Sequence, residues 1–278
     1  MPSEVSSHDD APPLRVTLLG TGTSTGIPVI GCDCRVCTSA DPRDDRTRTA
    51  CLVEAGPLRF VIDTGPDFRR QALREDLHRL DAALFTHHHF DHIVGLDDLR
   101  PFFHENDAPM PCFAHPRTVQ LFRRKFPHIF GEHRYPGAAH LALREVNGAF
   151  EIGSRYEDDC ETAAPVRAEP VRLWHGDLPT LGYRIGRFAY LTDTNRIPDE
   201  SVEQLAGRVD TLVIDALRRE AHPTHLCFEE AIEAARRISA RTTYFVHMTH
   251  SVMHAETEDE LPDDVHLGYD GLSFEIGG

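Results

Sequence analysis

The sequence predicts an α/β fold in which two mixed β-sheets pack together and are covered by helices. Apolar, β-like runs alternate with segments of helical periodicity, and hairpins occur in both halves of the chain. The length of 278 residues fits one large domain or two small ones. We expect residues 14–278 to form a single domain that follows a disordered tail over residues 1–13.

Each strand is predicted from an apolar run bounded by turn residues. The runs are Leu14–Leu19, Cys51–Ala55, Leu58–Ile62, Ala82–Thr86, Val166–Trp174, Leu181–Ile185, Arg187–Leu191, Thr211–Ile214 and Thr242–Val246. Apolar residues at helical spacing predict helices over Pro66–Leu80, from Gly95 to Arg100, around Glu200–Leu205 and over Cys227–Ile238. Residues 104–165 show the least regular pattern, and we expect surface elements there that shape a pocket.

Charge and hydropathy narrow the choice of partners. A formal net charge of −16 repels extended nucleic acid, although a small anionic substrate bound at metal ions remains compatible with it. No apolar run approaches the roughly 18–20 residues of a membrane-spanning helix. The polar, acidic segment Met1–Pro13 lacks the pattern of a secretory signal, so we expect a cytoplasmic protein with no membrane partner.

Metal-binding side chains are concentrated in residues 86–92, where Thr-His-His-His-Phe-Asp-His follows an apolar run. His87, His89 and Asp91 alternate, so an extended backbone places them on one side, and His92 adds a ligand at the turn. A catalytic zinc usually takes about three protein ligands, so these residues are too many for one ion. They predict a pair of ions about 4 Å apart, a geometry used to hydrolyse phosphoesters.

This string resembles the metal-binding motif of the metallo-β-lactamase superfamily, and the resemblance implies a four-layer αββα sandwich. The superfamily pattern also needs an Asp at an early strand end, a single His, a bridging Asp and a late His. Asp63, His175, Asp193 and His247 occur in that order, each at the end of an apolar run. Alone, an Asp at a strand end is often only a turn or cap residue. Together with the His loop, the four indicate one site.

The resemblance divides these residues between two ions. The implied ligand sets are His87, His89 and His175 for the first ion, and Asp91, His92 and His247 for the second. Asp193 would bridge the ions, and Asp63 would orient a histidine of the loop. A water between the ions should ionise near neutral pH, since one zinc lowers its pKa to about 7, and the bridging hydroxide would be the nucleophile. The mixed N and O ligands suit Zn²⁺ or Mn²⁺, with iron as an alternative.

A second metal motif is formed by Cys32, Cys34 and Cys37 in a Cys-rich loop near residues 31–38. Three thiolates leave a tetrahedral zinc one ligand short, and a redox cluster is the alternative. The seven cysteines are odd in number and unevenly placed, which argues against a disulfide framework.

The motifs Gly31–Cys37, His247-Met248-Thr249-His250 and Gly268-Tyr269-Asp270-Gly271 resemble a narrower family, the phosphoribosyl 1,2-cyclic phosphate phosphodiesterases of the carbon–phosphorus lyase pathway. That resemblance implies that His250 completes a structural Cys₃His zinc, and that this zinc stabilises a loop at a homodimer interface. His254 is the alternative ligand, because one helical turn separates it from His250.

The narrower resemblance also implies a catalytic His shortly after the strand Thr211–Ile214. His222 and His225 are the candidates, and His225 matches better because a helix begins directly after it. It would protonate the leaving oxygen or hold the phosphate; the alternative is a helix-cap or surface histidine. The implied function is a dinuclear phosphodiesterase for a small cyclic or nucleotide-like phosphodiester. The alternatives are a transfer-RNA 3′-end processing nuclease, a thioester or lactam hydrolase, and a non-catalytic metal-binding accessory protein of coenzyme biosynthesis.

Overall fold

Two seven-stranded sheets organise the chain in the computed structural model, which describes residues 12–103, 108–132, 135, 137–160 and 163–277. The first sheet, in spatial order, consists of β14 (Ser273–Ile276), β1 (Leu14–Gly20), β2 (Ala50–Ala55), β3 (Leu58–Ile62), β4 (Ala82–Phe85), β5 (Met110–Ala114) and β6 (Leu141–Glu145). The second sheet consists of β13 (Val265–Leu267), β12 (Thr242–Val246), β11 (Thr211–Asp215), β10 (Phe188–Leu191), β9 (Leu178–Ile185), β8 (Val166–His175) and β7 (Phe150–Ile152).

Both sheets are mixed, as the sequence predicts. In the first sheet, β14, β1, β2 and β3 pair antiparallel, whereas β3, β4, β5 and β6 run parallel. In the second sheet, β7, β8, β9 and β10 pair antiparallel, whereas β10, β11, β12 and β13 run parallel. The parallel half of each sheet therefore brings several strand ends to one edge.

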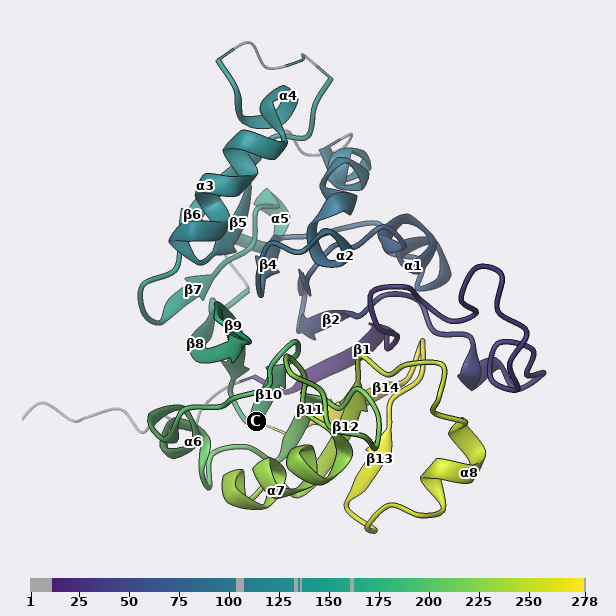
Figure 1. Cartoon of the computed structure of the whole chain (residues 1–278). Coiled ribbons are helices and arrows are strands. Elements are labelled where there is room, and N and C mark those ends of the chain that lie inside the picture. The colour runs from purple at the N-terminus through teal and green to yellow at the C-terminus, as the bar shows by residue number, and fades with distance from the viewer. Residues whose placement is uncertain (1–11, 104–107, 133–134, 136, 161–162, 278) are drawn as a thin grey trace, which may run out of the picture.

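Helices cover the outer faces of both sheets, so the predicted αββα sandwich is confirmed (Figure 1). The first sheet packs against α1 (Phe68–Arg74), η2 (Val94–Phe103), α3 (Pro116–Lys125) and α4 (Pro127–Phe130). The second sheet packs against α6 (Asp199–Leu205) and α7 (Phe228–Ile238). The remaining helices are η1 (Pro42–Asp44), α2 (Phe90–Ile93), α5 (Glu157–Cys160) and α8 (His254–Glu258).

The alternation of side chains along each strand builds the layers. In β2, Cys51 and Val53 join the apolar cluster between the sheets, whereas Leu52 joins the cluster under the helices of the first sheet. In β10, Tyr190 faces the other sheet and Leu191 faces α6 and α7. Both faces of these strands are apolar because both are covered, and this double burial holds the strands rigidly beneath the site.

All nine predicted strands form, and β3 and β12 have the predicted bounds. The helix predicted over Pro66–Leu80 is wrong in length, because α1 ends at Arg74. Asp76 takes a left-handed φ of 50°, and the amide of Leu77 donates to the carbonyl of Ala72. This six-residue hydrogen-bonded turn closes the helix end.

The irregular pattern of residues 104–165 conceals more regular structure than we expected. Its described part contains β5 and β6, which extend the parallel half of the first sheet, together with the ten-residue helix α3. Residues 1–11 of the predicted tail lie outside the described residues, and β1 begins at Leu14 as predicted. Among the described residues, no helix has the length and apolar character needed to cross a membrane.

Candidate metal centre

Five predicted site residues lie where strands end at one edge of the two sheets. Asp63 directly follows β3, and His87 comes shortly after β4, which runs parallel to β3. His175 is the last residue of β8 in the second sheet. Asp193 follows β10 and His247 follows β12, two strands that run in the same direction. Ligands commonly bind outside the carboxyl ends of parallel strands.

The structure brings the predicted first ligand set together. His87, His89, His175 and Asp193 place one donor atom each within 4.8 Å of one another. The rings of His87 and His89 lie 4.5 Å apart between centroids, and those of His89 and His175 lie 5.0 Å apart. His89 is exposed and the other three residues are buried, so this group is open to solvent on one side.

The predicted second ligand set forms a similar group. Asp91, His92, Asp193 and His247 also place donor atoms within 4.8 Å of one another. The Nε2 atom of His92 lies 3.3 Å from Asp91 Oδ2, and that of His247 lies 3.7 Å from the same oxygen. Residues far apart in the sequence therefore converge on one small volume.

Asp193 belongs to both groups. Its Oδ1 lies 3.2 Å from His92 Nε2, whereas its Oδ2 lies 3.4 Å from His247 Nε2 and 3.8 Å from His87 Nε2. The carboxylate thus stands between the two sets with both oxygens directed at imidazole nitrogens. This is the position that a bridging ligand would need.

Hydrogen bonds to the opposite ring nitrogens fix three of these imidazoles. The Nδ1 of His87 lies 3.0 Å from Thr86 Oγ1, that of His92 lies 2.7 Å from Asp63 Oδ2, and that of His175 lies 2.6 Å from the carbonyl of Thr224. An acceptor at Nδ1 leaves Nε2 as the lone-pair nitrogen, which is the usual arrangement of a metal-binding histidine.

Several nitrogens directed into the site have no hydrogen-bond partner. Among the described residues, the buried Nε2 atoms of His87, His92 and His247 make no hydrogen bond, although oxygens of Asp193 lie 3.8, 3.2 and 3.4 Å from them, respectively. An unpaired buried polar atom costs about 1–3 kcal/mol, so three of them in one cluster need an explanation. Divalent cations fit this donor set, since they would satisfy all three nitrogens and offset the buried carboxylates.

Burial and mutual charge set the protonation of the cluster. Burial and the neighbouring His92 hold the pKa of His87 well below its usual range, and burial also lowers the pKa of His175. Burial opposes ionisation of Asp193, but His247 and His92 outweigh it and hold the pKa of this carboxyl well below its usual range. Burial likewise disfavours the charged form of His92, yet Asp193, Asp91 and Asp63 raise its pKa well above the usual value. Without a cation, the cluster therefore holds an ionised Asp193, neutral His87 and His175, and a protonated His92, whose proton a bound cation would replace.

Asp63 supports the His loop from beneath. Its side chain is fully buried, and it accepts hydrogen bonds from the Thr86 amide at 2.9 Å, from Thr86 Oγ1 at 2.8 Å and from His92 Nδ1 at 2.7 Å. These bonds join the ends of β3 and β4 and orient the ring of His92. Asp63 thus contacts a predicted ligand and is absent from both donor groups.

His225 lies against one histidine of each group. Its ring centroid is 4.5 Å from that of His175 and 4.6 Å from that of His247. Its Nδ1 lies 2.7 Å from Asp215 Oδ2. Burial disfavours the imidazolium, but the Asp215 carboxylate outweighs it and raises the pKa of His225 to about 9. His222, the other candidate, lies 5.2 Å from the His225 ring.

Asp215 is a site residue that our sequence reasoning missed. It ends β11 and is fully buried, and its Oδ2 also accepts a hydrogen bond from the Thr194 amide at 2.8 Å. The signal was available, because an Asp follows the apolar run Thr211–Ile214 just as Asp63 and Asp193 follow theirs. Without a partner in the motif, this Asp could not be told from an ordinary strand end.

Backbone strain marks the same edge. Asp63, Asp193 and His247 have φ values of 66°, 51° and 64°, in the left-handed region that residues other than glycine seldom adopt. Such conformations cost on the order of 1–3 kcal/mol each and concentrate at functional sites. Here they turn the three side chains into the site directly after their strands.

Gly65 allows a close approach between two backbone segments of the site. A Cβ built on Gly65 would lie 2.0 Å from the carbonyl oxygen of Asp91. The turn after β3 and the His loop can therefore touch only because this residue has no side chain.

A separate group brings His250 to the three cysteines. The Nδ1 of His250 lies 3.3 Å from Cys32 Sγ, 3.6 Å from Cys34 Sγ and 3.5 Å from Cys37 Sγ. Tetrahedral zinc with Zn–S near 2.3 Å and Zn–N near 2.0–2.1 Å would separate these atoms by about 3.6 Å. His254 is absent from this group; it is buried, its amide donates to Asp44, and its ring lies 5.8 Å from that of Tyr269.

Comparison with known proteins places this geometry in a family. A model described as a beta-lactamase superfamily domain matches residues 58–248. A solved diphosphatase from the PhnP family is 39% identical with a TM-score of 0.85, over 95% of this chain and 97% of that one. Zn²⁺-bound PqqB from Methylobacterium extorquens, at 18% identity and a TM-score of 0.69, shares the fold.

Two curated relatives carry other names. An octanoyltransferase from Porphyromonas gingivalis is 41% identical over 263 residues, which cover 93% of this chain and 51% of that protein. The chain thus spans about half the length of this relative. A ribonuclease Z from Mycobacterium bovis is 30% identical over 227 residues, which cover 74% of this chain and 71% of that protein. The chain belongs to the beta-lactamase superfamily, as a metal-dependent hydrolase that resembles the PhnP family.

Proposed function

We propose that this protein is a dinuclear phosphodiesterase that hydrolyses a small cyclic or nucleotide-like phosphodiester, such as phosphoribosyl 1,2-cyclic phosphate. The observation that carries the proposal is the position of Asp193 between two sets of ligand atoms, with one oxygen directed at His92 and the other at His87 and His247. The diphosphatase of the PhnP family supports the choice of a phosphorus substrate.

The proposed ligands of the two ions, Zn²⁺ or Mn²⁺, are His87, His89, His175, Asp91, His92 and His247, with Asp193 shared between them. When bound, such ions would supply an ionised water and neutralise charge on a phosphoryl oxygen. Asp63 holds His92 in place from outside the donor set. The unpaired nitrogens of the cluster support this assignment.

His225 is proposed as the general acid. Asp215 accepts the hydrogen bond from Nδ1, which leaves Nε2 as the atom that faces other partners. A protonated His225 next to His175 and His247 is placed to donate a proton to the oxygen that leaves phosphorus. Asp215 orients the ring and stabilises its charged form.

The reaction class is tested with bis-p-nitrophenyl phosphate and metal-reconstituted protein, with p-nitrophenyl phosphate and a thioester assayed in parallel. We expect metal-dependent cleavage of the diester alone, and a loss of at least about 10³-fold in Asp193→Asn. Asp76→Asn is the matched control, because Asp76 has a similar φ of 50° and an exposed side chain outside the site. Turnover of the thioester without the diester would overturn the proposal.

The role of His225 is tested through the leaving group. A p-nitrophenolate departs without protonation, whereas a methoxide or nucleoside leaving group needs a proton. We expect His225→Ala to lose about 10²–10⁴-fold with a poor leaving group and much less with p-nitrophenolate. His222→Ala is the control and should behave like wild type. An equal loss with both leaving groups would remove the general-acid assignment.

Transfer-RNA 3′-end processing is the second candidate. The ribonuclease Z relatives favour it, and α3 offers four exposed cations, Arg117, Arg123, Arg124 and Lys125, without an acidic residue. The net charge of −16 opposes it. Specific cleavage of a precursor transfer RNA, faster than that of any small diester and steeply weakened by salt, would replace the first proposal.

The Cys32, Cys34, Cys37 and His250 group is proposed to hold a structural zinc, and the loop that carries it to lie at a homodimer interface. Ile30, next to this loop, is 98% exposed, so a substitution there would probe the proposed interface without disturbing the core. Sedimentation should show a dimer that Ile30→Asp shifts toward monomer. A wild-type monomer at micromolar concentration would contradict the interface.

A further inference from the structure

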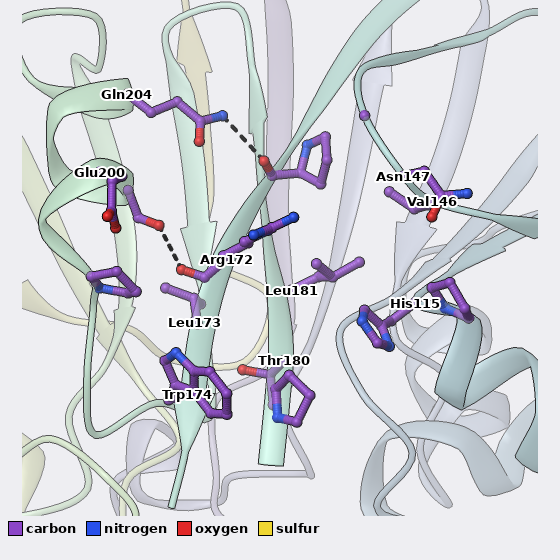
Figure 2. Close-up of a pocket in the computed structure, with 16 residues that line it drawn as sticks. His115, Val146, Asn147, Arg172, Leu173, Trp174, Thr180, Leu181, Glu200 and Gln204 are labelled. Atoms are coloured by element: carbon purple, nitrogen blue, oxygen red, sulfur yellow. Dashed lines mark hydrogen bonds between the residues drawn. The ribbon is translucent and has the colours of Figure 1, made fainter. Parts of the chain in front are cut away.

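A pocket of about 800 Å³ lies between β8, β9 and the first part of α6, which contributes Glu200, on one side and the segments that follow β5 and β6 on the other. Figure 2 shows Arg172, Trp174 and Thr180 on one wall, with His115 and Asn147 across from them. Small-molecule sites in proteins measure about 300–1,000 Å³. The pocket can therefore hold a group much larger than the single phosphoryl group that the metal centre would bind.

The pocket adjoins the metal centre through its own walls. Trp174 directly precedes His175, so their Cα atoms are about 3.8 Å apart. Thr180 Oγ1 donates a hydrogen bond to the carbonyl of Asp193 at 3.3 Å. The amide of Leu181 donates at 2.9 Å to the carbonyl of Thr86, the residue before His87. Trp174 and His175 leave β8 on opposite sides, and no proposed metal ligand lines the pocket, so the two sites are joined through the backbone at the end of β8. A substrate with its phosphorus at the metals would extend its distal part past this strand end into the pocket.

An aromatic ring and a cation share one wall. Trp174 and Arg172 are two residues apart on β8, so their side chains leave the strand on the same side. Trp174 is half-buried, and the guanidinium carbon of Arg196 lies 4.9 Å from its ring centroid. Arg172 is exposed, and its guanidinium makes no ion pair with any residue that the structure describes. A stacking surface beside an uncommitted guanidinium is the combination that binds a nucleobase and a phosphate.

The opposite wall adds hydrogen-bonding groups of moderate polarity. His115 Nδ1 accepts the amide of Arg117 at the start of α3. Burial and the nearby Arg117 and Arg172 lower the pKa of His115, which favours its neutral form. Asn147 contributes an amide from the segment after β6. Neutral donors and acceptors of this kind suit the edge of a base or the hydroxyls of a ribose.

We propose that this pocket binds the nucleoside part of a nucleotide-like substrate, with the base stacked on Trp174 and a non-reacting phosphate or hydroxyl held by Arg172. The proposal rests on the proposed phosphodiesterase function and narrows its substrate class. A cyclic phosphosugar without a base would leave most of the pocket unfilled. The pocket therefore favours substrates that carry a base.

Trp174 makes the test direct, because it is the only tryptophan in the sequence. Its fluorescence is followed while metal-loaded protein is titrated with adenosine 5′-monophosphate, and separately with ribose 5-phosphate. We expect a saturable change with the nucleotide alone. Arg172→Ala should weaken nucleotide binding about tenfold, whereas Arg167→Ala, an exposed residue of the same strand outside the pocket, should not.

Equal responses to the two ligands, or no response to either, would overturn the proposal. So would a nucleotide affinity that Arg172→Ala leaves unchanged. The hydrolysis of bis-p-nitrophenyl phosphate is measured on the same preparations. If the protein lacks diesterase activity but binds the nucleotide in a way that depends on Arg172, the proposed function is refuted and the pocket assignment is supported. If it has diesterase activity but shows no such binding, the proposed function is supported and the pocket assignment is refuted.

Discussion

Replacing Gly65 with alanine should disable the metal centre and leave the fold intact. The added Cβ would lie 2.0 Å from the carbonyl oxygen of Asp91, and such contacts are essentially never shorter than 3.0 Å. The backbone at Asp91 must therefore retreat by about 1 Å, the difference between these two values. Asp91 and His92, two predicted ligands, move with it. A displacement of about 1 Å in a reacting geometry costs about 10²-fold in rate.

The assay compares kcat/KM for bis-p-nitrophenyl phosphate, metal content by elemental analysis and the far-ultraviolet circular dichroism spectrum. We expect Gly65→Ala to lose about 100-fold in kcat/KM, with substoichiometric metal and a wild-type spectrum. Gly153→Ala is the control, because its Cβ would meet nothing within 4 Å. Wild-type metal content and kcat/KM in Gly65→Ala would refute the argument that the loop depends on this close approach.

Three further predictions address the metals. Asp63→Asn should weaken active-site metal binding about 10–100-fold in competition with a chromophoric chelator, since Asp63 orients His92, and equal affinity would contradict that role. Cys37→Ser should remove one equivalent of zinc. A decrease of about 2 kcal/mol in the free energy of unfolding would lower Tm by about 4–8 °C in calorimetry. An unchanged Tm would exclude a structural zinc. Re-adding metal to chelator-treated protein at 100 times Kd should restore about 2.7 kcal/mol, and an unresponsive unfolding curve would argue against a bound ion.

The fold was predictable wherever strands are covered on both faces. Apart from Arg59, Leu58–Ile62 and Thr242–Val246 consist of apolar, aromatic or β-branched residues, and their bounds match the prediction. The strands β5 and β6, within residues 104–165, were not predicted, and the reason differs between the two. β5 is interrupted by Pro111, and β6 ends in exposed charged residues at the edge of its sheet. Neither gives a periodic signal that exceeds its surroundings.

The residues of the candidate site that belong to recognisable sequence motifs could be predicted. The His loop and the strand-end residues His175, Asp193 and His247 were found from sequence, and the structure brings their donor atoms together. Asp63 was also found, and it contacts the loop through His92. Asp215 was missed because its partner, His225, is joined to it only by the fold. The choice between His250 and His254 also depended on the structure, because the two are only four residues apart in the sequence and both could reach the cysteines. The pocket at Trp174 has no local signature.

The predicted ligands are divided between the two sheets. The His loop follows β4 of the first sheet, whereas the other ligands come from the second, namely His175, Asp193 and His247. An ion bound by ligands from both sheets would link the two sheets to each other. The free energy of metal binding would then be coupled to the free energy of packing the two sheets together. Tyr183 lies between the sheets, and its hydroxyl donates a hydrogen bond to the carbonyl of Phe85 in the other sheet. A substitution at such a position should therefore change the metal affinity before it unfolds the chain.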